Sequence, residues 1–326
     1  MSLITTIEVK KKHVILLYLI AFIMVIVATF RPEGMADYSS YLHAITKSSH
    51  HDADRFEPTF TLIKYLSFNI PLVVFFIYAL ISISIRTSQI LKLSPLVWGS
   101  MLIYISNVYI LHDMIQIRAA VVSALLLVII PFIYERNFKA FIITTIIAIL
   151  FHYSAAAFLF LWFLRPNSNT RIYFIAALIL SYAMAVLGIT VTQVISFIPF
   201  APIQTLYNMY VMHFDDYVNV FNSLQLIRCM ICVFFWIFID VINSRYTIFA
   251  LILKIYTIAL CALPLFSDIT TIAVRFNQLL LSVEIILLPS GFYHLFRQKY
   301  LAKGLNLAYA AIVLLYSLTN QQYWFD

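Results

Sequence analysis

Long apolar runs constrain this sequence more than any other feature. They recur from residue 14 to residue 320, and each is about long enough for a helix to cross a ~30 Å hydrocarbon core. Hydrophobic residues make up 63% of the chain and charged residues 11%, whereas a soluble domain has roughly one half and one quarter. The runs are continuous rather than alternating, which argues against a membrane β-barrel. We therefore predict an all-α, polytopic transmembrane helical bundle.

The apolar runs and their charged flanks define the expected spans, and the chain shows no boundary that would divide it. We expect a single integral membrane domain over 1–326, with about 10–11 membrane segments. The stretch 140–164 is ambiguous, because it could form one long span or two half-helices folded into a hairpin at His152. The other spans are predicted at 13–30, 71–90, 95–111, 115–134, 172–189, 223–242, 246–266, 275–291 and 304–320.

The distribution of basic residues decides between the two interpretations of 140–164. With a hairpin, most of the 21 lysines and arginines lie on cytoplasmic flanks, Arg86 among them, as the positive-inside rule requires. A single span would move four basic residues beyond residue 240 to the outside. We therefore prefer the hairpin, which puts the long loops at about 31–70 and 190–222 on the outer, periplasmic side. The net charge of +7 then encodes orientation and does not indicate nucleic-acid binding.

Polar residues gather where the first span reaches the outer side. Arg31, Asp37, Tyr38 and Tyr41 follow this span, and Glu57 directly precedes a proline and a further apolar stretch. An interfacial loop with aromatic anchors would also have such a composition, and an acid before proline is an ordinary helix start. The pattern alone leaves both the structural and the functional interpretation open.

Two arginines stand at the outer starts of spans, where the helix dipole disfavours a cation. Asp113 lies three residues before Gln116, so it fits a capping box that satisfies the backbone N–H groups of a helix start. Capping does not account for Arg118, near the second turn, or for Arg275, which opens a later span. Each of these arginines needs an anion opposite it.

His152 lies among apolar residues, and a histidine in such a setting is as often a satisfied core residue as a functional one. Glu284 is a second deep polar residue, and we expect a buried, hydrogen-bonded acid. Arg31, Arg118 and Arg275 share one predicted side of the membrane with His152. Because guanidinium groups bind phosphate in a planar, bidentate way, this group of residues predicts a site for a phosphate, such as a lipid-borne diphosphate.

Other ligand classes have little support. Five glycines in the whole chain leave no glycine-rich phosphate loop, so a nucleotide is not expected. No HExxH or similar spacing occurs, and we expect neither a metal nor a cofactor. One polar stretch has residues that could bind a divalent ion, but a solvated loop is the simpler interpretation; it contains His50, His51, Asp52 and Asp54.

The order of these motifs resembles the EpsG-like family, within the Wzy-type polymerases of O-antigen and other bacterial polysaccharides. The resemblance runs from residue 31 to about residue 280. One departure is Ala119, which follows Arg118 where the family usually has glutamine; Gln116 is a possible substitute on the helix. The matching positions are Arg31, Asp37, Tyr38, Tyr41, Glu57, Pro58, Asp113, Ile117, Arg118, Ala119, Phe151, His152, Ser154, Ala155 and Arg275.

The resemblance implies a glycosyltransferase-C-like enzyme of the bacterial inner membrane, with its active site facing the periplasm. Such an enzyme joins oligosaccharide repeat units carried on undecaprenyl diphosphate, and the expected partners are this lipid-linked donor and acceptor, membrane lipid and a chain-length regulator. His152, Asp37 and Glu57 are the candidates for the catalytic base. The diphosphate is assigned to Arg118, Arg275 and Arg31, and sugar binding to Tyr38, Tyr41, Asp113 and Gln116.

Two other functions fit parts of the sequence. A membrane O-acyltransferase would also use His152 as a base, but a cytoplasmic acyl donor would call for polar residues on the inner side. A transporter or flippase for lipid-linked oligosaccharides would show polar residues along several helices and, often, repeated halves. Lys254 and Glu284 are the deep charges of this chain, and no repeat is visible.

Overall fold

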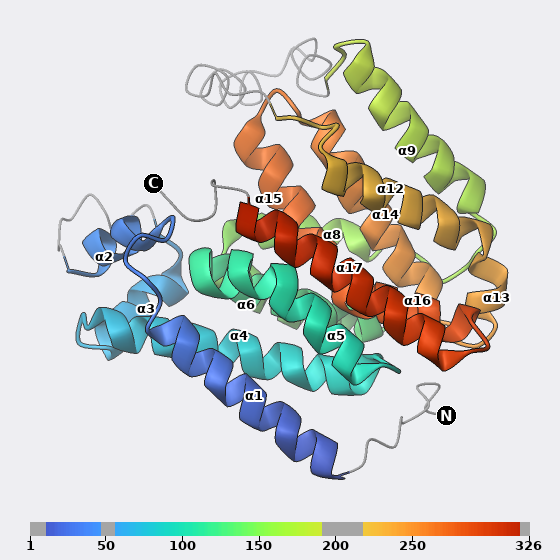
Figure 1. Ribbon diagram of the computed structural model, residues 1–326. Helices are drawn as coiled ribbons and strands as arrows, with labels where there is room; N and C mark the ends of the chain where they lie inside the picture. The colour runs from blue at the N-terminus through green and yellow to red at the C-terminus, as the bar shows by residue number, and fades with distance from the viewer. Residues whose placement is uncertain (1–10, 47–55, 191–217, 320–326) are drawn as a thin grey trace. The chain divides into compact units, whose positions relative to one another are not determined.

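The computed structural model describes residues 11–46, 56–190 and 218–319, and over these ranges the chain contains helices and no strand (Figure 1). This confirms the predicted all-α class. The chain divides into two compact units, Met1–Leu164 with Glu284–Asp326, and Arg165–Val283. We call them the first and the second unit. The expectation of a single membrane domain over 1–326 stays a prediction. Most of the predicted outer loop at 190–222, and the polar stretch with His50, lie outside the described residues.

The first unit contains the segments that carry most of the predicted site residues. Its helices are α1 (Lys11–Thr29), α2 (Tyr38–Thr46), α3 (Pro58–Leu66), α4 (Pro71–Leu93), α5 (Val97–Ile103), the π-helix η2 (Tyr104–Ile115), α6 (Ile117–Tyr134), α7 (Phe138–Phe151), the 3-10 helix η3 (Tyr153–Ala157), α8 (Phe158–Leu161), α16 (Glu284–Leu295) and α17 (Lys299–Thr319). The second unit contains α9 (Arg171–Val186), α12 (Ser223–Ile237), α13 (Ile239–Asn243), α14 (Phe249–Leu265) and α15 (Thr270–Leu281).

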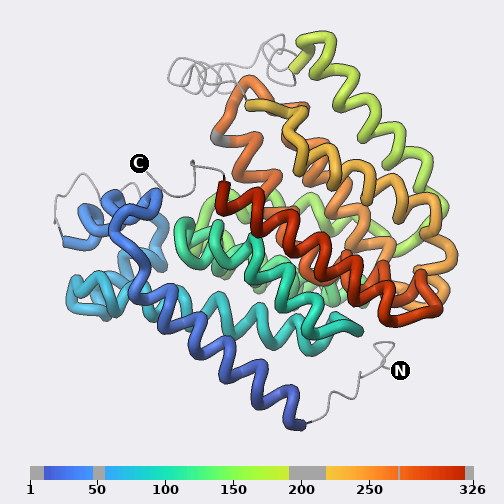
Figure 2. Tube along the Cα trace, in the orientation of Figure 1, coloured from blue at the N-terminus to red at the C-terminus, as the bar shows by residue number. Residues whose placement is uncertain are grey.

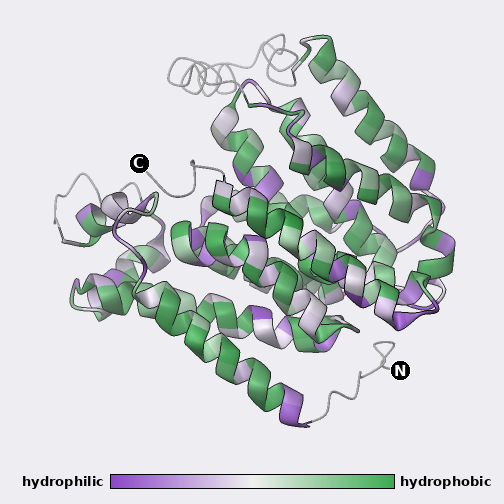
Figure 3. Cartoon of the chain, viewed as in Figure 1, coloured by the Kyte–Doolittle hydropathy of each residue, from purple (hydrophilic) through white to green (hydrophobic). Residues whose placement is uncertain are grey.

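Four of the described helices, α1, α4, α6 and α17, are long and apolar enough to cross a membrane, and a fifth span results if α15 and α16 count as one. Apolar colour extends along α1, with hydrophilic residues at its first turn (Figure 3). The side chains of Ile15 and Phe22 on this helix are more than half exposed, as expected of residues that face lipid. By contrast, α6 is buried along most of its length. The membrane bundle is thereby confirmed.

The stretch 138–164 is a hairpin, as the basic residues predicted. The helix α7 ends at Phe151, and His152 has an extended backbone with φ −161° and ψ 126°. The chain then returns along α7, because Arg136 Nη1 donates to the carbonyl of Trp162 at 2.5 Å and Arg136 Nη2 to that of Leu164 at 2.6 Å. The rings of Phe138 and Trp162 also meet, at 5.1 Å between centroids. Both ends of the hairpin therefore lie together, and His152 is at its tip.

The end of the first unit that contains the hairpin tip also contains α2, the start of α3 and the break between η2 and α6. Figure 2 shows α2 and α3 near the end of α1, and Lys64 on α3 donates to the carbonyl of Ala44 on α2 at 2.7 Å. Thr59 donates its hydroxyl to the carbonyl of Leu150, at 2.6 Å, which ties the start of α3 to the end of α7. The π-helix η2 ends at Gln116, whose φ of −95° and ψ of 66° break the helix before α6 begins. This end therefore gathers the starts of α3 and α6 and the ends of α1 and α7.

In the second unit, α14 is the most buried helix and its polar side chains are paired. Trp236 Nε1 donates to the hydroxyl of Thr257 at 2.9 Å, and Asn277 donates to the carbonyl of Ala259 at 2.9 Å. Lys254, one of the deep charges of the sequence, donates to Arg165 O at 2.8 Å and to Asn167 Oδ1 at 2.7 Å. Lys254 on α14 therefore holds the segment before α9 through these two hydrogen bonds.

Candidate functional site

Three of the predicted residues, from three distant segments, meet at the polar end of the first unit. Glu57 lies just before α3, Arg118 in the first turn of α6 and His152 at the tip of the hairpin. One carboxylate oxygen of Glu57 accepts a hydrogen bond from Arg118 Nη1, and the other contacts His152 Nδ1. The amide of Tyr153 also points to Glu57 Oε1, at 3.4 Å. We call Glu57, Arg118 and His152 the open cluster.

Local sequence explains how each member of the open cluster is held. Pro58 occupies the first turn of α3, where its missing N–H costs nothing, so Glu57 has an extended backbone and presents its side chain beside the helix start. The break at Gln116 turns the chain between η2 and α6, and Arg118 follows it directly. His152 is the residue at which α7 stops. All three side chains thus come from helix ends, where the backbone leaves regular helix geometry.

Aromatic rings surround the guanidinium of Arg118. Its Cζ lies 4.8 Å from the ring centroid of Phe56, 5.7 Å from that of Tyr41 and 5.9 Å from that of Phe60. Such rings attract a cation electrostatically and exclude water from it. The side chain of Arg118 keeps 19% of its surface exposed and that of Glu57 only 3%. The ion pair is therefore shielded but remains in reach of a ligand.

The charges of the open cluster fix the ionisation of Glu57. Burial by itself raises the pKa of this carboxyl, but the hydrogen bond with His152 and the charge of Arg118 outweigh burial and lower the pKa from 4.5 to about 2. Glu57 is therefore an anion at neutral pH. A carboxylate at Nδ1 of His152 places the proton on that nitrogen and leaves Nε2 as an acceptor. Nε2 has no hydrogen-bond partner within the described part of the chain.

A second arginine, Arg31, lies close to the open cluster. It is 5% exposed, its Nη1 donates to Met114 O at 2.7 Å, and its Cζ lies 4.3 Å from the ring centroid of Phe75. Burial lowers the pKa of Arg31 from 12.5 to about 10. Burial raises the pKa of Tyr41, and the charges of Arg118 and Arg31 both oppose that rise. Tyr41 therefore lies near both guanidinium groups and links Arg31 to the open cluster.

The remaining predicted residues occupy several environments. Tyr38 is half-buried with its ring 5.7 Å from that of Phe75, whereas Asp37 is exposed with a φ of 65°. Gln116 is half-buried at the helix break. Arg275 is exposed on α15 of the second unit, and its part in diphosphate binding stays a prediction, as does the role of each residue above.

The comparison with protein families decides the identity of the chain. A model of the EpsG family matches residues 14–325, nearly the whole sequence. The chain belongs to the EpsG family. No curated protein and no solved structure matches it. Membership in the EpsG family confirms the resemblance seen in the motifs, and it indicates a function in making polysaccharide, of the polymerase kind, in a membrane.

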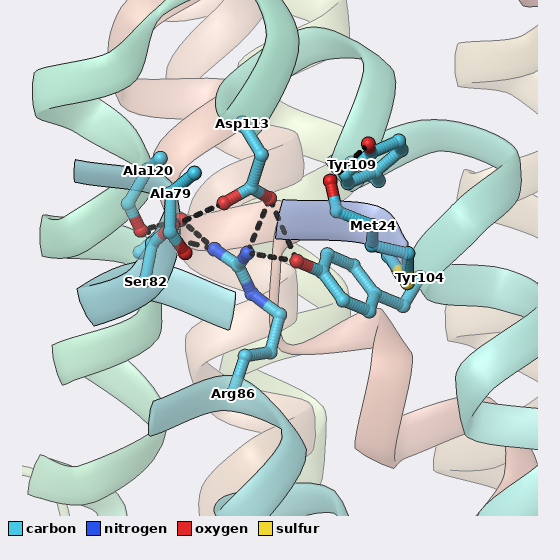
Figure 4. A network of polar contacts seen from close by, with 9 residues as sticks. Met24, Ala79, Ser82, Arg86, Tyr104, Tyr109, Asp113 and Ala120 are labelled. Carbon is cyan, nitrogen blue, oxygen red and sulfur yellow. Dashed lines mark hydrogen bonds and ion pairs between the residues drawn. The ribbon is translucent and has the colours of Figure 1, made fainter. Parts of the chain in front are cut away.

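This EpsG family protein also contains a polar network that sequence reasoning missed (Figure 4). Arg86 Nη1 donates to Asp113 Oδ2 at 2.6 Å, and Tyr104 donates its hydroxyl to the same oxygen at 2.9 Å. Ser82 donates to Asp113 Oδ1, while Arg86 Nη2 reaches Ser123 Oγ and, at 3.0 Å, the carbonyl of Ala120. We call these residues the closed cluster. It joins α4, η2 and α6, and both charged side chains are 0% exposed.

The closed cluster corrects two sequence interpretations. Arg86 does not lie on a cytoplasmic flank, because α4 continues to Leu93 and buries it. Asp113 does not cap α6, whose first residue follows Gln116, because the carboxylate of Asp113 is engaged by Arg86, Ser82 and Tyr104. The signal available in the sequence was weak, because an arginine four positions before the predicted end of a span looks like a flanking residue. Glu284 is a buried acid, as expected, hydrogen-bonded by Asn107 and Tyr309 at 3.0 and 2.9 Å.

Proposed function

We propose that this EpsG family protein is a polysaccharide polymerase that joins undecaprenyl-diphosphate-linked oligosaccharide repeat units at the periplasmic face of the inner membrane. One observation carries the proposal: a histidine is held at Nδ1 by a buried carboxylate, which also pairs with an arginine. This is the arrangement of an oriented base beside a fixed positive charge, and glycosyl transfer from a lipid diphosphate needs both.

The reaction follows from these groups. A hydroxyl of the incoming lipid-linked repeat unit attacks the anomeric carbon of the growing chain, and a new C–O bond forms there. The bond between that carbon and the diphosphate oxygen breaks, and undecaprenyl diphosphate leaves with the bonding electron pair. The hydroxyl proton passes to Nε2 of His152, and Glu57 stabilises the imidazolium that results. The step needs no metal and no nucleotide.

Among the three candidates for the base, His152 fits best. Glu57 has a pKa of about 2 and both of its oxygens are engaged, so it is a poor proton acceptor and instead orients His152. Asp37 is exposed and lies outside the open cluster. In this assignment Glu57 is a positioning residue and His152 the catalytic one. Tyr38, Tyr41 and Gln116 remain candidates for contacts with sugar, whereas Asp113, assigned to sugar from the sequence, is 0% exposed and paired with Arg86.

The positive charges around the departing diphosphate are assigned to Arg118, Arg31 and Arg275, with Arg118 already paired with Glu57. A guanidinium keeps its charge in a low-dielectric setting and matches two phosphate oxygens. Arg118 and Arg31 flank Tyr41 in the first unit. Arg275, exposed near the start of α15, is proposed as a third contact on the basis of its position in the family motif.

The periplasmic orientation is proposed from charge. The open cluster lies at the end of α1 and α7 and at the start of α6, so the opposite end of the first unit contains the basic residues Lys11, Lys12, Arg136 and Lys139. Basic flanks favour the cytoplasm. The site would then face the periplasm, where a regulator of chain length is the expected protein partner.

The test is a gel profile of surface glycan from a strain that lacks the gene, complemented with variants. Wild type should restore a ladder of repeat units, whereas His152→Gln should leave a single unit on the lipid. His13→Gln is the matched control, since His13 lies at the other end of α1 and packs on Trp98 at 6.1 Å between rings. A full ladder in the deletion strain would rule out the polymerase. An intact ladder with lost acetyl content would point to the acyltransferase instead.

A further inference from the structure

Arg31 is a buried cation whose charge is balanced only in part, by the longer-range attraction of Asp113. No carboxylate of the described residues forms an ion pair with it, and within those residues its guanidinium donates one hydrogen bond, from Nη1 to the carbonyl of Met114. Its Nε and Nη2 are both buried, and neither has a hydrogen-bond partner among the described residues. Burying a charge without a partner is expensive, so such a group is retained where something else benefits from it.

The two unpartnered nitrogens lie on one edge of the guanidinium. Nε and Nη2 point their N–H bonds in nearly parallel directions, and this edge is the fork that binds two oxygens of a carboxylate or phosphate side by side. The third nitrogen, Nη1, is fixed by Met114 O at 2.7 Å, and Phe75 supports one face of the plane at 4.3 Å. The orientation of the fork is therefore set by the protein before any ligand arrives.

Arg118 differs in this respect. Its charge is balanced by Glu57, and its Nη1 is occupied by that carboxylate. Only Nε of Arg118 is buried without a partner. An anion at Arg118 would compete with Glu57 and would disturb the carboxylate that holds His152. An anion at Arg31 disturbs no such pair.

We propose that Arg31 is the principal receptor for one phosphate group of the lipid diphosphate, and that Arg118 chiefly holds Glu57 in place. The inference rests on the proposed function, because Tyr41 connects Arg31 to the cluster in which the sugar reacts. The fork is buried in this structure, so the proposed binding requires a local movement before an anion reaches it. The neighbouring helix α2 is suited to such a movement, since it has nine residues and buries only Tyr41, Ala44 and Ile45.

The first experiment measures binding by thermal unfolding of the purified full-length protein in detergent. The probes are inorganic pyrophosphate and farnesyl diphosphate, a soluble prenyl diphosphate. Either probe should raise the unfolding temperature of wild type, and Arg31→Met should weaken that binding about tenfold or more, as expected for losing a charged bidentate contact. Arg118→Met should keep most of it. A shift with farnesyl diphosphate alone identifies a lipid-borne ligand, and a shift with both identifies the phosphate group itself.

The second experiment measures the same variants without a ligand. Arg31→Met should unfold at the wild-type temperature or above it, because the substitution removes a buried cation that has no ion-pair partner among the described residues. The matched control is Arg86→Met, which strands Asp113 and should unfold at a clearly lower temperature. If Arg31→Met is as unstable as Arg86→Met, or if Arg118→Met abolishes binding while Arg31→Met does not, the inference is wrong. The polymerase proposal fails separately, in the glycan ladder of His152→Gln.

Discussion

The first unit contains two arginine–carboxylate pairs of the same chemistry in very different settings. In the closed cluster, Arg86 and Asp113 are 0% exposed, and hydroxyl groups or a carbonyl from α4, η2 and α6 form further hydrogen bonds with them, while Arg86 Nε has no partner among the described residues. In the open cluster, Arg118 keeps 19% of its side chain exposed, and Glu57 shares its second oxygen with a histidine. The first pair is enclosed by protein and the second borders a reactive group.

The difference separates two uses of a buried charge. A fully enclosed pair specifies how helices meet, and it adds little net stability over apolar side chains of the same size. A partly satisfied pair holds a charge ready for a group outside the protein. Arg31 has two buried nitrogens without a partner among the described residues, so it is the arginine best suited to bind a group from outside the protein. Substitutions in the closed cluster should therefore affect folding, and those in the open cluster chemistry.

The largest expected effect is on catalysis. His152→Gln removes the proposed base and should lower the rate of repeat-unit joining by about 10²–10⁴-fold. The unfolding temperature should stay close to that of wild type, because the side chain borders the solvent-accessible part of the cluster. The rate is measured with purified protein and lipid-linked repeat units. If the variant also unfolds at a clearly lower temperature than wild type, His152 has a structural role, and the contrast between the open and the closed cluster is wrong.

Breaking the closed cluster should have the largest effect on stability. Asp113→Leu leaves Arg86 buried and unpaired, which should cost about 3–5 kcal/mol in the free energy of unfolding. Denaturant or thermal unfolding in detergent checks this value. Glu57→Leu is the matched substitution in the open cluster, where partial exposure of Arg118 should make the loss smaller. Equal losses would contradict the comparison.

Removing both partners of the closed cluster should restore most of that stability. The double variant Arg86→Met/Asp113→Leu removes both charges, and its free energy of unfolding should lie within about 2 kcal/mol of the wild-type value. The apolar pair no longer ties η2 to α6 across the turn that carries Arg118. We therefore expect activity to stay below wild type although the fold has recovered. If both stability and activity return to wild-type values, the charges of the closed cluster have no part in positioning Arg118.

The smallest expected effect is a dependence of stability on pH. Because the pKa of Glu57 is lowered from 4.5 to about 2 in the folded protein, its pairing contributes stability above pH 4.5, and this contribution is lost as the pH falls toward 2. Unfolding temperatures recorded from pH 6 to pH 2 should decrease less for Glu57→Gln than for wild type. Parallel curves for the two proteins would mean that the pair does not lower the pKa of Glu57.

Much of this architecture could be predicted from the sequence, for physical reasons. Apolar runs report spans because the membrane requires them, and the basic flanks correctly favoured a hairpin at 140–164. Arg118 was found because capping and the helix dipole do not explain a cation there, whereas Glu57 and His152 were open to a structural interpretation and were singled out together with the family motifs. Arg86 was missed because it lies 27 positions before Asp113, and no local pattern encodes a contact made by packing. The unequal pairing of Arg31 and Arg118 also depends on three-dimensional neighbours.

The turn at His152 couples two properties of the chain. The bend at His152 brings this side chain to Glu57 and also returns the chain to Arg136, so the position of the proposed base and the direction of the chain after the hairpin depend on the same turn. A mutation that straightened residues 138–164 into one helix would invert the orientation of every segment after it. If the proposed function holds, the orientation of these segments and the placement of the base depend on the same few backbone angles. A lineage that lost the bend would have to replace both at once.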